Sequence, residues 1–410
     1  MPPTPDAWAP GPDAPADAPG AAPRPTADRA AARERGDACP GALRLHRADD
    51  GALARIRLPG GLLTVPQLLA LADAAEELGD GALETTSRGN VQLRGLPADA
   101  GPVLGRRLRA AGLLPSDTHE RVRNIVASPL SGLDDEGHAA VHPWVRELDA
   151  RLCASDWAAA LSGKFLFALD DGRGDVAGLD ADVTLIATPG GALLRLGRAT
   201  LARPVVEPVE AALAAARDFL TVAQGRAWHL REVPDLVPAG TVPLPRATAP
   251  VPALGALPGG LSVQIPFGRA TTDRWRLLAG AAGPDGVRLT PWRGAVLPGA
   301  PDGRLADLAA AGFRTVPGSA WEGASACTGL PGCAKSLADV RADAARALAV
   351  LPAGPPVHWS GCERRCGHPA GTWVDVLATG QGYRVTAAGT STDVTTDEMA
   401  EAVAEARRTK

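Results

Sequence analysis

The strongest constraint in this 410-residue chain is a set of four cysteines near its C-terminal end, arranged as two short clips. The first clip is Cys327 and Cys333 (C-x5-C), and the second is Cys362 and Cys366 (C-x3-C). Four thiolates are the usual ligands of a [4Fe–4S] cluster, which takes one sulfur per iron. Glycines in and beside both clips allow the backbone to close on a cluster and to direct N–H groups at its sulfurs. The spacing therefore predicts a [4Fe–4S] cluster held by all four cysteines.

Three other roles for these cysteines stay open: a zinc site, disulfides and buried structural thiols. Zinc sites usually have about two to four residues between paired cysteines, so the spacings found here fit poorly. Disulfides require an oxidising compartment, and the N-terminus lacks the charged and then apolar regions of a secretory signal. Cys39 and Cys153 lie far from both clips and are expected to be ordinary thiols.

The segment that follows the first clip has the pattern of a helix. Apolar residues recur with helical spacing over residues 335–348. Such a helix would place Cys333 near its N-terminus, where the helix dipole favours the thiolate form.

Composition limits the partners. The chain has 42 basic and 46 acidic residues, which gives no support for binding to nucleic acid or to an acidic membrane. No stretch approaches the roughly 18 apolar residues needed to span a bilayer. The cytoplasm is the expected location, because a cluster and thiols survive there. Lysine occurs only at 164, 335 and 410, so each internal lysine is a candidate for a site that needs a compact charge.

Proline-rich segments and an internal repeat divide the chain. Residues 1–37 have few large apolar side chains and are predicted to be a disordered tail, and residues 233–258 are predicted to be a linker. The pattern of residues 40–115 recurs in residues 259–312 as a strand–helix–strand unit. Larger α/β segments follow at 118–232 and 315–405, and the latter carries the clips. The alternative is a chance likeness between unrelated α/β units.

In the first copy, the expected strand 53–58 is followed by a helix that opens with a Thr64–Gln67 capping box, and then by a strand over 83–94. The second copy has strands at 261–265 and 287–294 and a helix at 271–281. Aligning the Arg-Gly pairs places Arg88 opposite Arg293. Each unit is too small to bury its own face, so the two are expected to pair into one composite sheet.

Several motifs follow one another in a recognisable order: T-x-R-G-N-x-Q at 86–92, R-N-I at 123–125, G-K-F at 163–165, and the two cysteine clips. Together they resemble the nitrite/sulfite reductase superfamily over residues 40–400. The resemblance implies an α+β fold with duplicated ferredoxin-like half-domains and two larger sulfite-reductase-like α/β domains. In siroheme-containing members, the cysteine that matches Cys366 also bridges the cluster to the siroheme iron.

The same resemblance implies a cationic pocket around a tetrapyrrole. Arg88, Arg123 and Lys164 match three cations of this pocket, and the fourth position, a lysine in the reductases, is Leu166 here. Losing that lysine makes reduction of an oxyanion less favourable, because the pocket loses a charge and a proton donor. Gln92 and Arg94 are added as candidates, since alternate residues of a strand share the face assigned to Arg88.

The second clip and its flanks, Ser360 to Pro369, read S-G-C-x-x-x-C-x-H-P and resemble the precorrin-3B synthase branch of the superfamily. This likeness implies O2-dependent hydroxylation of precorrin-3A, with lactone formation, in cobalamin biosynthesis. The substrate would occupy the cavity that holds siroheme in the reductases. A siroheme-dependent nitrite or sulfite reductase is the alternative, and an electron-transfer or tetrapyrrole-carrier protein is a third reading.

The likeness also implies a mononuclear non-haem iron beside the cluster. A 2-His-1-carboxylate site is one conventional way to hold such an iron, and His358, His368 and His119 are the candidates by sequence position. Electrons would come from a separate reductase or ferredoxin, because the one Gly-x-Gly cluster, at 172–174, lacks the rest of a nicotinamide-binding fingerprint.

Overall fold

The computed structural model describes residues 39–233, 251–369 and 371–408, together with residues 37, 236 and 240–245. The chain divides into two units, Met1–Ala38 and Cys39–Lys410. All the described helices and strands belong to the second unit. The predicted disordered tail lies outside the described residues except for Asp37.

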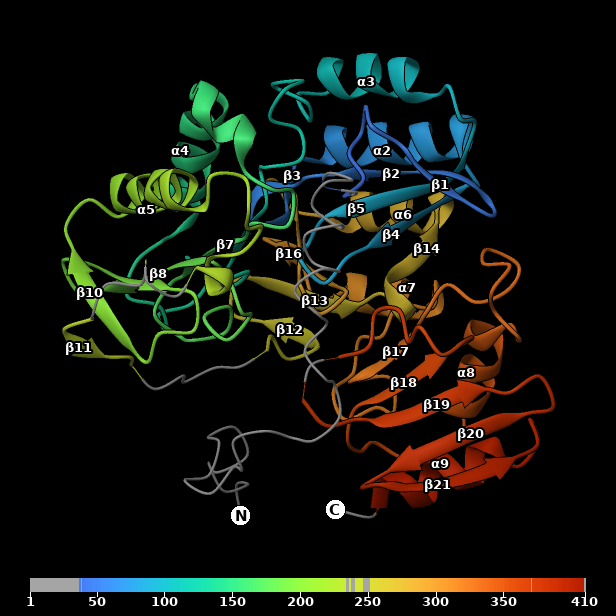
Figure 1. The fold of residues 1–410 in the computed structure, drawn as a ribbon. Helices are drawn as coiled ribbons and strands as arrows, with labels where there is room; N and C mark the ends of the chain where they lie inside the picture. Colours follow the sequence, from blue (N-terminus) through green and yellow to red (C-terminus); the bar gives the residue numbers. More distant parts are fainter. Residues whose placement is uncertain are drawn as a thin grey trace. The chain divides into compact units, whose positions relative to one another are not determined.

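Four β-sheets and the helices beside them give this unit a mixed α+β architecture (Figure 1). Two five-stranded sheets correspond to the two predicted copies. The first copy's sheet has the order β1(His46–Ala48), β2(Gly51–Ile56), β5(Val91–Leu96), β4(Ala82–Thr85), β14(Arg269–Thr271). The second copy's sheet has the order β12(Gly255–Leu257), β13(Gly260–Gln264), β16(Gly294–Pro298), β15(Val287–Leu289), β3(Leu62–Leu63).

The expectation of one composite sheet is wrong, because the two copies instead exchange one strand each. β14 follows β13 in the chain but pairs with β4 of the first copy, and β3 of the first copy pairs with β15 of the second. Each exchanged strand covers an edge that would otherwise present unpaired backbone groups. Figure 1 shows β14 beside β4. The copies are thus joined at two sheet edges.

One hydrophobic core serves both copies. The helices of the first copy are α2(Val65–Leu78) and α3(Gly101–Ala110), and those of the second are α6(Thr272–Ala281) and α7(Arg304–Ala310). Leu68 and Leu71 of α2 and Trp275 of α6 are buried in the same apolar cluster. The predicted capping box is confirmed: the Thr64 side chain accepts from the Gln67 N–H and the Gln67 side chain accepts from the Thr64 N–H.

Each closing strand of the repeat is in fact a hairpin. The segment predicted as a strand over 83–94 is β4, a turn over 86–90, and β5; the segment 287–294 contains β15, a turn, and the start of β16. Arg88 therefore lies in a turn and does not share a strand face with Gln92 and Arg94. The polar residues of this turn continue the polar–apolar alternation of the strands, so the segment resembles one long strand. The Arg-Gly-Asn sequence is typical of a turn and was the available signal.

The two turns have the same hydrogen-bond pattern. Superposing them on this pattern shifts the sequence alignment of the Arg-Gly pairs by one residue. In one turn the Thr86 hydroxyl accepts from the Asn90 N–H, and in the other the Thr290 hydroxyl accepts from the Gly294 N–H. In both turns the residue before the donor has a positive φ, which is 66° at Gly89 and 59° at Arg293. Arg293 is therefore the counterpart of Gly89, and not of Arg88.

Two larger sheets follow the copies. The first α/β sheet has the order β11(Val242–Pro243), β10(Leu201–Val205), β9(Gly191–Leu196), β8(Val183–Thr188), β7(Phe167–Asp170), β6(Ile125–Ala127), with helices α4(His142–Cys153) and α5(Pro208–Ala223). The second α/β sheet has the order β17(Ala324–Ala326), β18(Val357–Ser360), β19(Val374–Ala378), β20(Tyr383–Ala387), β21(Thr390–Val394), with helices α8(Val340–Leu348) and α9(Met399–Arg408).

These two sheets share a pattern of pairing. β6, β7 and β8 run parallel, as do β17, β18 and β19, and each sheet then continues with antiparallel strands. Short 3-10 helices lie at Pro59–Gly61, Asp156–Ala160, Leu230–Glu232 and Pro266–Gly268.

The segment predicted as a linker, 233–258, is not free of regular structure. It contains β11, which pairs with β10, and β12, which pairs with β13. Its residues 234–235, 237–239 and 246–250 lie outside the described part of the chain. Among the described residues, no helix has the length and apolar character required to cross a membrane.

Candidate metal centre

The fold brings the two cysteine clips to one edge of the second α/β sheet. Cys327 follows β17 directly, and Cys362 follows β18 after one glycine. Because β17 and β18 are neighbouring parallel strands, the chain leaves both at the same edge. The Cys327 N–H donates to the Trp359 carbonyl at 2.9 Å, and the Leu337 N–H donates to the Gly361 carbonyl at 2.8 Å. These bonds hold the loops of the two clips together.

Glycines shape this edge as expected for a cluster site. The Gly361 N–H donates to the Cys327 sulfur at 3.2 Å. A Cβ added at Gly361 would lie 1.8 Å from the Ser336 hydroxyl oxygen, so any larger residue would push the two loops apart. Gly329 has a φ of 71°, and its Cβ would lie 2.8 Å from a methyl carbon of Val340. Both glycines are thus required by the backbone path around Cys327.

The thiols have the exposure and surroundings of ligands. Cys327, Cys333 and Cys362 are partly buried, Cys366 is exposed, and none of the four, all of which the structure describes, forms a disulfide. Burial raises the pKa of Cys327, and the N–H groups of Gly361 and Gly329 act against this. The charge of Cys366 raises this pKa further, so the clips are close enough for their sulfurs to interact. Four thiols from two adjacent clips, with N–H groups at sulfur, fit a [4Fe–4S] cluster.

The predicted helix over 335–348 begins five residues later than expected. Helix α8 starts at Val340, and the Asp339 side chain caps it by accepting from the Ala342 N–H. Leu337, one of the apolar residues that suggested this helix, lies before it and is 55% exposed. The preceding residues bond to the loops, since the Leu330 N–H donates to the Ala338 carbonyl. Cys333 is therefore not at a helix N-terminus, and its thiolate gains no direct stabilisation from the helix dipole.

The first copy of the repeat holds the first clip in place. Arg94 forms a two-pronged ion pair with Asp50, with both N–O distances 2.8 Å, and also donates to the Gly332 carbonyl at 3.2 Å. The Ala334 N–H donates to the Asp49 carboxylate at 2.9 Å. These bonds flank Cys333 on both sides. Arg94 is also a predicted tetrapyrrole ligand, and in this structure its guanidinium holds the loop of the first clip.

A second link runs through Glu84 and Arg341. Arg341 donates to the Glu84 carboxylate at 2.6 Å and to the Cys327 carbonyl at 3.1 Å. Nearby cations, Arg341 before Arg94 and Arg269, hold the pKa of Glu84 below its ordinary value although burial acts in the opposite sense. Sequence reasoning missed this link, because nothing in the sequence pairs residues so far apart.

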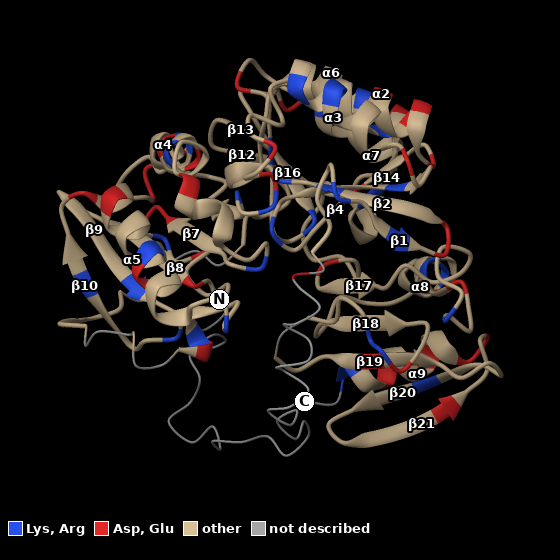
Figure 2. Cartoon of the chain, turned by 45° about the horizontal axis from the view of Figure 1, so that its top comes forward, with Lys and Arg blue, Asp and Glu red and all other residues tan. Residues whose placement is uncertain are grey.

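Two further cations predicted for the pocket, Arg123 and Lys164, are already engaged by other residues. Arg123 pairs with both oxygens of Asp149, at 2.6 and 2.7 Å, and donates to the Leu113 carbonyl at 3.1 Å. The Lys164 ammonium lies 3.6 Å from the centre of the Trp228 ring, which is a cation–π contact. Charged residues of both signs are interspersed over the described elements (Figure 2).

Arg88 and Gln92 lie on the first copy. Gln92 accepts two hydrogen bonds from Arg55, at 3.1 and 2.5 Å. The Arg88 Nε is buried and has no hydrogen-bond partner among the described residues. Arg88 lies close enough to Arg55 for its charge to lower the pKa of Arg55, after the larger effect of burial. Among the described residues, Arg88 is therefore the predicted pocket arginine whose guanidinium is available to an anionic ligand.

The three histidines are not brought together as an iron site. His119 uses both ring nitrogens, one with the hydroxyls of Ser116 and Thr118 and the other with the Ser155 carbonyl at 3.0 Å. It therefore has no nitrogen left for a metal. His368 is exposed and stacks on Trp373 with 4.7 Å between the ring centres.

His358 has the best properties of the three. It is fully buried, its Nδ1 lies 2.8 Å from the Ser325 hydroxyl, and its Nε2 has no hydrogen-bond partner among the described residues. Burial, followed by the charges of Arg293 and His368, lowers the pKa of His358 to about 4, so the ring is neutral at pH 7. In the described part of the chain, neither His368 nor a carboxylate joins it within 4.8 Å in a set of three ligands.

A different acidic group was missed by sequence reasoning. Ligand atoms of Asp170, Asp171 and Asp175 lie within 4.8 Å of one another at the end of β7. Asp170 accepts from four backbone N–H groups, and Asp171 accepts from the guanidinium of the fully buried Arg173. Because donors already occupy both carboxylates, this group locks the 170–177 loop. The density of Asp and Gly in this loop was the available signal.

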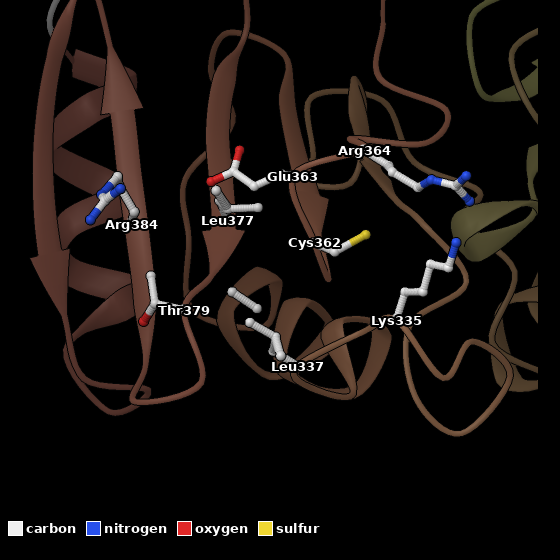
Figure 3. A pocket seen from close by; sticks show the side chains of 9 residues that line it. Lys335, Leu337, Cys362, Glu363, Arg364, Leu377, Thr379 and Arg384 are labelled. Atoms are coloured by element: carbon white, nitrogen blue, oxygen red, sulfur yellow. The ribbon is translucent and has the colours of Figure 1, made fainter.

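A surface pocket of about 500 Å³ adjoins the second clip. Cys362, Lys335, Arg364, Leu337 and Leu377 are among the residues that line it. Figure 3 shows the Cys362 sulfur and the ends of the Lys335 and Arg364 side chains on one side of this pocket. Neither cation forms an ion pair with a residue that the structure describes. The pocket therefore gives a partly basic approach to the clip from solvent.

Known proteins resemble this chain over its repeat and beyond. The family model for the nitrite/sulfite reductase ferredoxin-like half domain matches residues 45–111. The chain is 28% identical over 377 residues to a precorrin-3B synthase from a Sinorhizobium species, spanning 84% of this chain and 81% of that protein. It is also 28% identical over 384 residues to the ferredoxin–nitrite reductase of Synechococcus elongatus, spanning 77% of this chain and 74% of that enzyme.

Among solved structures, that of the Mycobacterium tuberculosis NirA protein has the same fold. The TM-score is 0.66 at 20% identity, over 85% of this chain and 79% of that one. The repeat, the paired α/β sheets and the order of motifs agree with these likenesses. Residues 45–111 therefore match a half domain of the nitrite/sulfite reductase family, and the chain shares the fold of the NirA protein over 85% of its length.

Proposed function

We propose that this chain is an iron–sulfur monooxygenase of the precorrin-3B synthase type, which hydroxylates precorrin-3A with O2 and forms a lactone. The observation that carries this choice within the family is Leu166. It stands where the reductases have the second lysine of their K-F-K segment, and it is 2% exposed. Leu166 packs in a small apolar cluster with Val126, Ala168, Val176 and Ala181.

Leu166 argues against reduction of nitrite or sulfite. Such a reaction requires cations that gather an oxyanion and donors that deliver protons as its oxygens leave. The Leu166 side chain supplies neither, and Arg123 is already paired with Asp149. Arg88 remains available to an anionic ligand. A single guanidinium can pair with one carboxylate of a macrocycle, whereas a small oxyanion requires cations on several sides.

The relatives support the same choice without deciding it. The precorrin-3B synthase of Sinorhizobium aligns with this chain over slightly more of its length than the Synechococcus nitrite reductase does, at equal identity. The second clip, with S-G-C before and H-P after it, adds a local likeness to the same branch.

In the proposed reaction, one atom of O2 enters the macrocycle as a hydroxyl group and the other leaves as water. This consumes two electrons and two protons. A substrate carboxyl group then adds across a double bond of the macrocycle, which closes the lactone without loss of water. The four clip cysteines would hold the [4Fe–4S] cluster, which supplies single-electron transfer when bound. Arg88 would bind a substrate carboxylate.

Electrons would enter at the pocket beside Cys362. Lys335 and Arg364 line this pocket, and their charges favour an acidic electron-transfer protein such as a ferredoxin. The described residues do not assemble His358, His368 and His119 into a 2-His-1-carboxylate site, so we assign no step to a separate iron.

The decisive test is aerobic turnover of precorrin-3A in ¹⁸O2, with a ferredoxin and its reductase as the electron source. The proposal predicts a product that has gained one labelled oxygen atom, detected by mass spectrometry. No oxygen incorporation by protein that contains an intact cluster would overturn the proposal.

One alternative has specific support, namely a siroheme-dependent nitrite reductase, because the Synechococcus relative is equally identical. Protein purified with bound siroheme, and loss of nitrite driven by reduced methyl viologen, would establish this alternative and reject the monooxygenase. Cluster-containing protein that binds precorrin-3A but shows neither reaction would instead indicate a carrier.

A further inference from the structure

The turn between β15 and β16 carries an arginine where its counterpart has a glycine. Arg293 has a φ of 59°, in the left-handed region that favours glycine, and the equivalent residue Gly89 has 66°. A non-glycine residue in this region costs free energy and persists when the surroundings or a function demand it. The chain therefore retains an arginine side chain at a position where the backbone alone favours glycine.

The Arg293 side chain runs toward the second cysteine clip. A Cβ added at Gly268 would lie 2.9 Å from the Arg293 Cδ, so the missing side chain at Gly268 leaves room for the arginine to pass. A Cβ added at Gly367 would lie 3.8 Å from the Arg293 Nη2. Gly367 adjoins Cys366 in the chain. The charge of Arg293 also acts on His358, which lies in the strand that leads to this clip.

The Arg293 guanidinium has no bonding partner among the described residues. It makes no hydrogen bond or ion pair with a residue that the structure describes. Burial and then the charge of Arg341 lower the pKa of Arg293, and only Glu84 acts in the opposite sense. Glu84 is already bonded to Arg341 at 2.6 Å and to Arg269 at 3.4 Å. A partly buried cation in this position requires an anion.

We propose that the Arg293 guanidinium is the counter-charge of the iron–sulfur cluster and raises its reduction potential. A [4Fe–4S] cluster with four thiolate ligands carries net negative charge, and reduction adds one more electron to it. A fixed positive charge nearby favours the reduced form, and the effect is larger where protein excludes water. The inference rests on the cluster of the proposed function and holds for any reaction that the cluster serves.

The test is a potentiometric titration of the anaerobically purified protein, followed by the electron paramagnetic resonance signal of the reduced cluster. Arg293→Gln should shift the midpoint potential to a more negative value at unchanged iron and sulfide content. Arg293→Lys keeps a positive charge and should restore most of the potential. Arg203→Gln removes an exposed charge from β10 of the other α/β sheet and should leave the potential unchanged.

The outcomes separate this inference from the proposed function. An unchanged potential in Arg293→Gln, with the cluster intact, would overturn the inference and leave the monooxygenase proposal standing. If this variant instead binds precorrin-3A more weakly at an unchanged potential, Arg293 is a substrate-binding residue and the inference is wrong. Wild-type protein without iron and sulfide would reject the cluster itself, and with it both proposals.

Discussion

The two α/β sheets place very different chemistry at corresponding edges. In the first sheet, β6 leads to Ser128 and β7 leads to Asp171; the Ser128 hydroxyl donates to Asp175 at 2.6 Å and accepts from the Asp171 N–H at 3.0 Å. In the second sheet, the corresponding strands β17 and β18 lead to Cys327 and Cys362, which form no disulfide. One edge is closed by its own hydrogen bonds, and the other presents ligand atoms.

The difference shows what the fold provides and what the residues decide. Adjacent parallel strands always deliver two loops to one edge, whatever these loops contain. Aspartates with arginine and backbone donors satisfy one another and lock the loop. Four thiols beside glycine N–H groups do not satisfy one another and remain available as metal ligands.

The largest expected effect comes from replacing a cysteine of the second clip. Cys366→Ser should abolish the visible absorption of the cluster and the enzymatic activity together, because the remaining three thiolates cannot complete the ligand set. Cys366 is exposed, so the substitution should not unfold the protein. Cys153→Ser, which lies in neither clip, serves as the control and should retain iron and activity. Retained absorption in Cys366→Ser would remove this residue from the ligands.

Replacing an aspartate of the 170–177 loop should instead lower the stability of the folded protein. Asp171→Asn removes one ion pair of the buried Arg173, which keeps its pair with Asp134. We expect a loss of about 3 kcal/mol in the free energy of unfolding, the lower end for a broken buried ion pair. Asp180→Asn, which breaks pairs with the exposed Arg198 and Arg231, should cost less than about 1 kcal/mol. Urea titration measures both, and equal effects would contradict a structural role for the locked loop.

Among the predicted pocket cations, Arg88 differs from Arg94 and Arg123 because no carboxylate of the described residues pairs with it. Arg88→Ala should weaken binding of precorrin-3A by roughly ten- to a hundredfold, the usual effect of losing a charged hydrogen bond. The cluster should remain, because the Arg88 Nε donates to no described residue, those of the clips included. Isothermal titration calorimetry measures the affinity, with Arg203→Ala as the control for loss of an exposed charge. Unchanged affinity would exclude Arg88 from the substrate site.

Stability should also depend on pH through the cluster of Asp170, Asp171 and Asp175. Burial, followed by the charge of Asp170, raises the pKa of Asp175 to about 8. The folded state therefore keeps a proton that the unfolded chain loses near pH 4, its ordinary range, so stability should fall as pH rises from about 4 to about 8. Asp175→Asn should flatten this slope in urea titrations at several pH values. A variant with the same slope as the wild type would show that Asp175 does not bind the proton.

Part of this account was accessible from the sequence. The cysteine spacing, the glycines at the clips and the Thr64–Gln67 capping box each depend on residues close together in the chain. Such features follow local rules of ligation and helix capping. The family likeness also followed from motifs whose order is preserved along the chain.

Other features depended on partners that local patterns do not reveal. The exchanged strands β3 and β14 have two and three residues, too few to show a periodicity. Arg94 and Arg123 have the residue type of pocket cations, but Asp50 and Asp149 engage them through folding alone. The hairpin within 83–94 was misread because its turn continues the polar alternation of the strands. Sequence indicated which groups carry charge, and the fold determined which of them remain available.

The central claim is that the open edge of the second α/β sheet holds a [4Fe–4S] cluster on Cys327, Cys333, Cys362 and Cys366. Iron and acid-labile sulfide analysis of the protein purified without air tests it most directly. The account predicts about four irons and four sulfides per chain, with a reduced-cluster resonance signal after addition of dithionite. A colourless protein without iron or sulfide, or one that contains stoichiometric zinc, would contradict it.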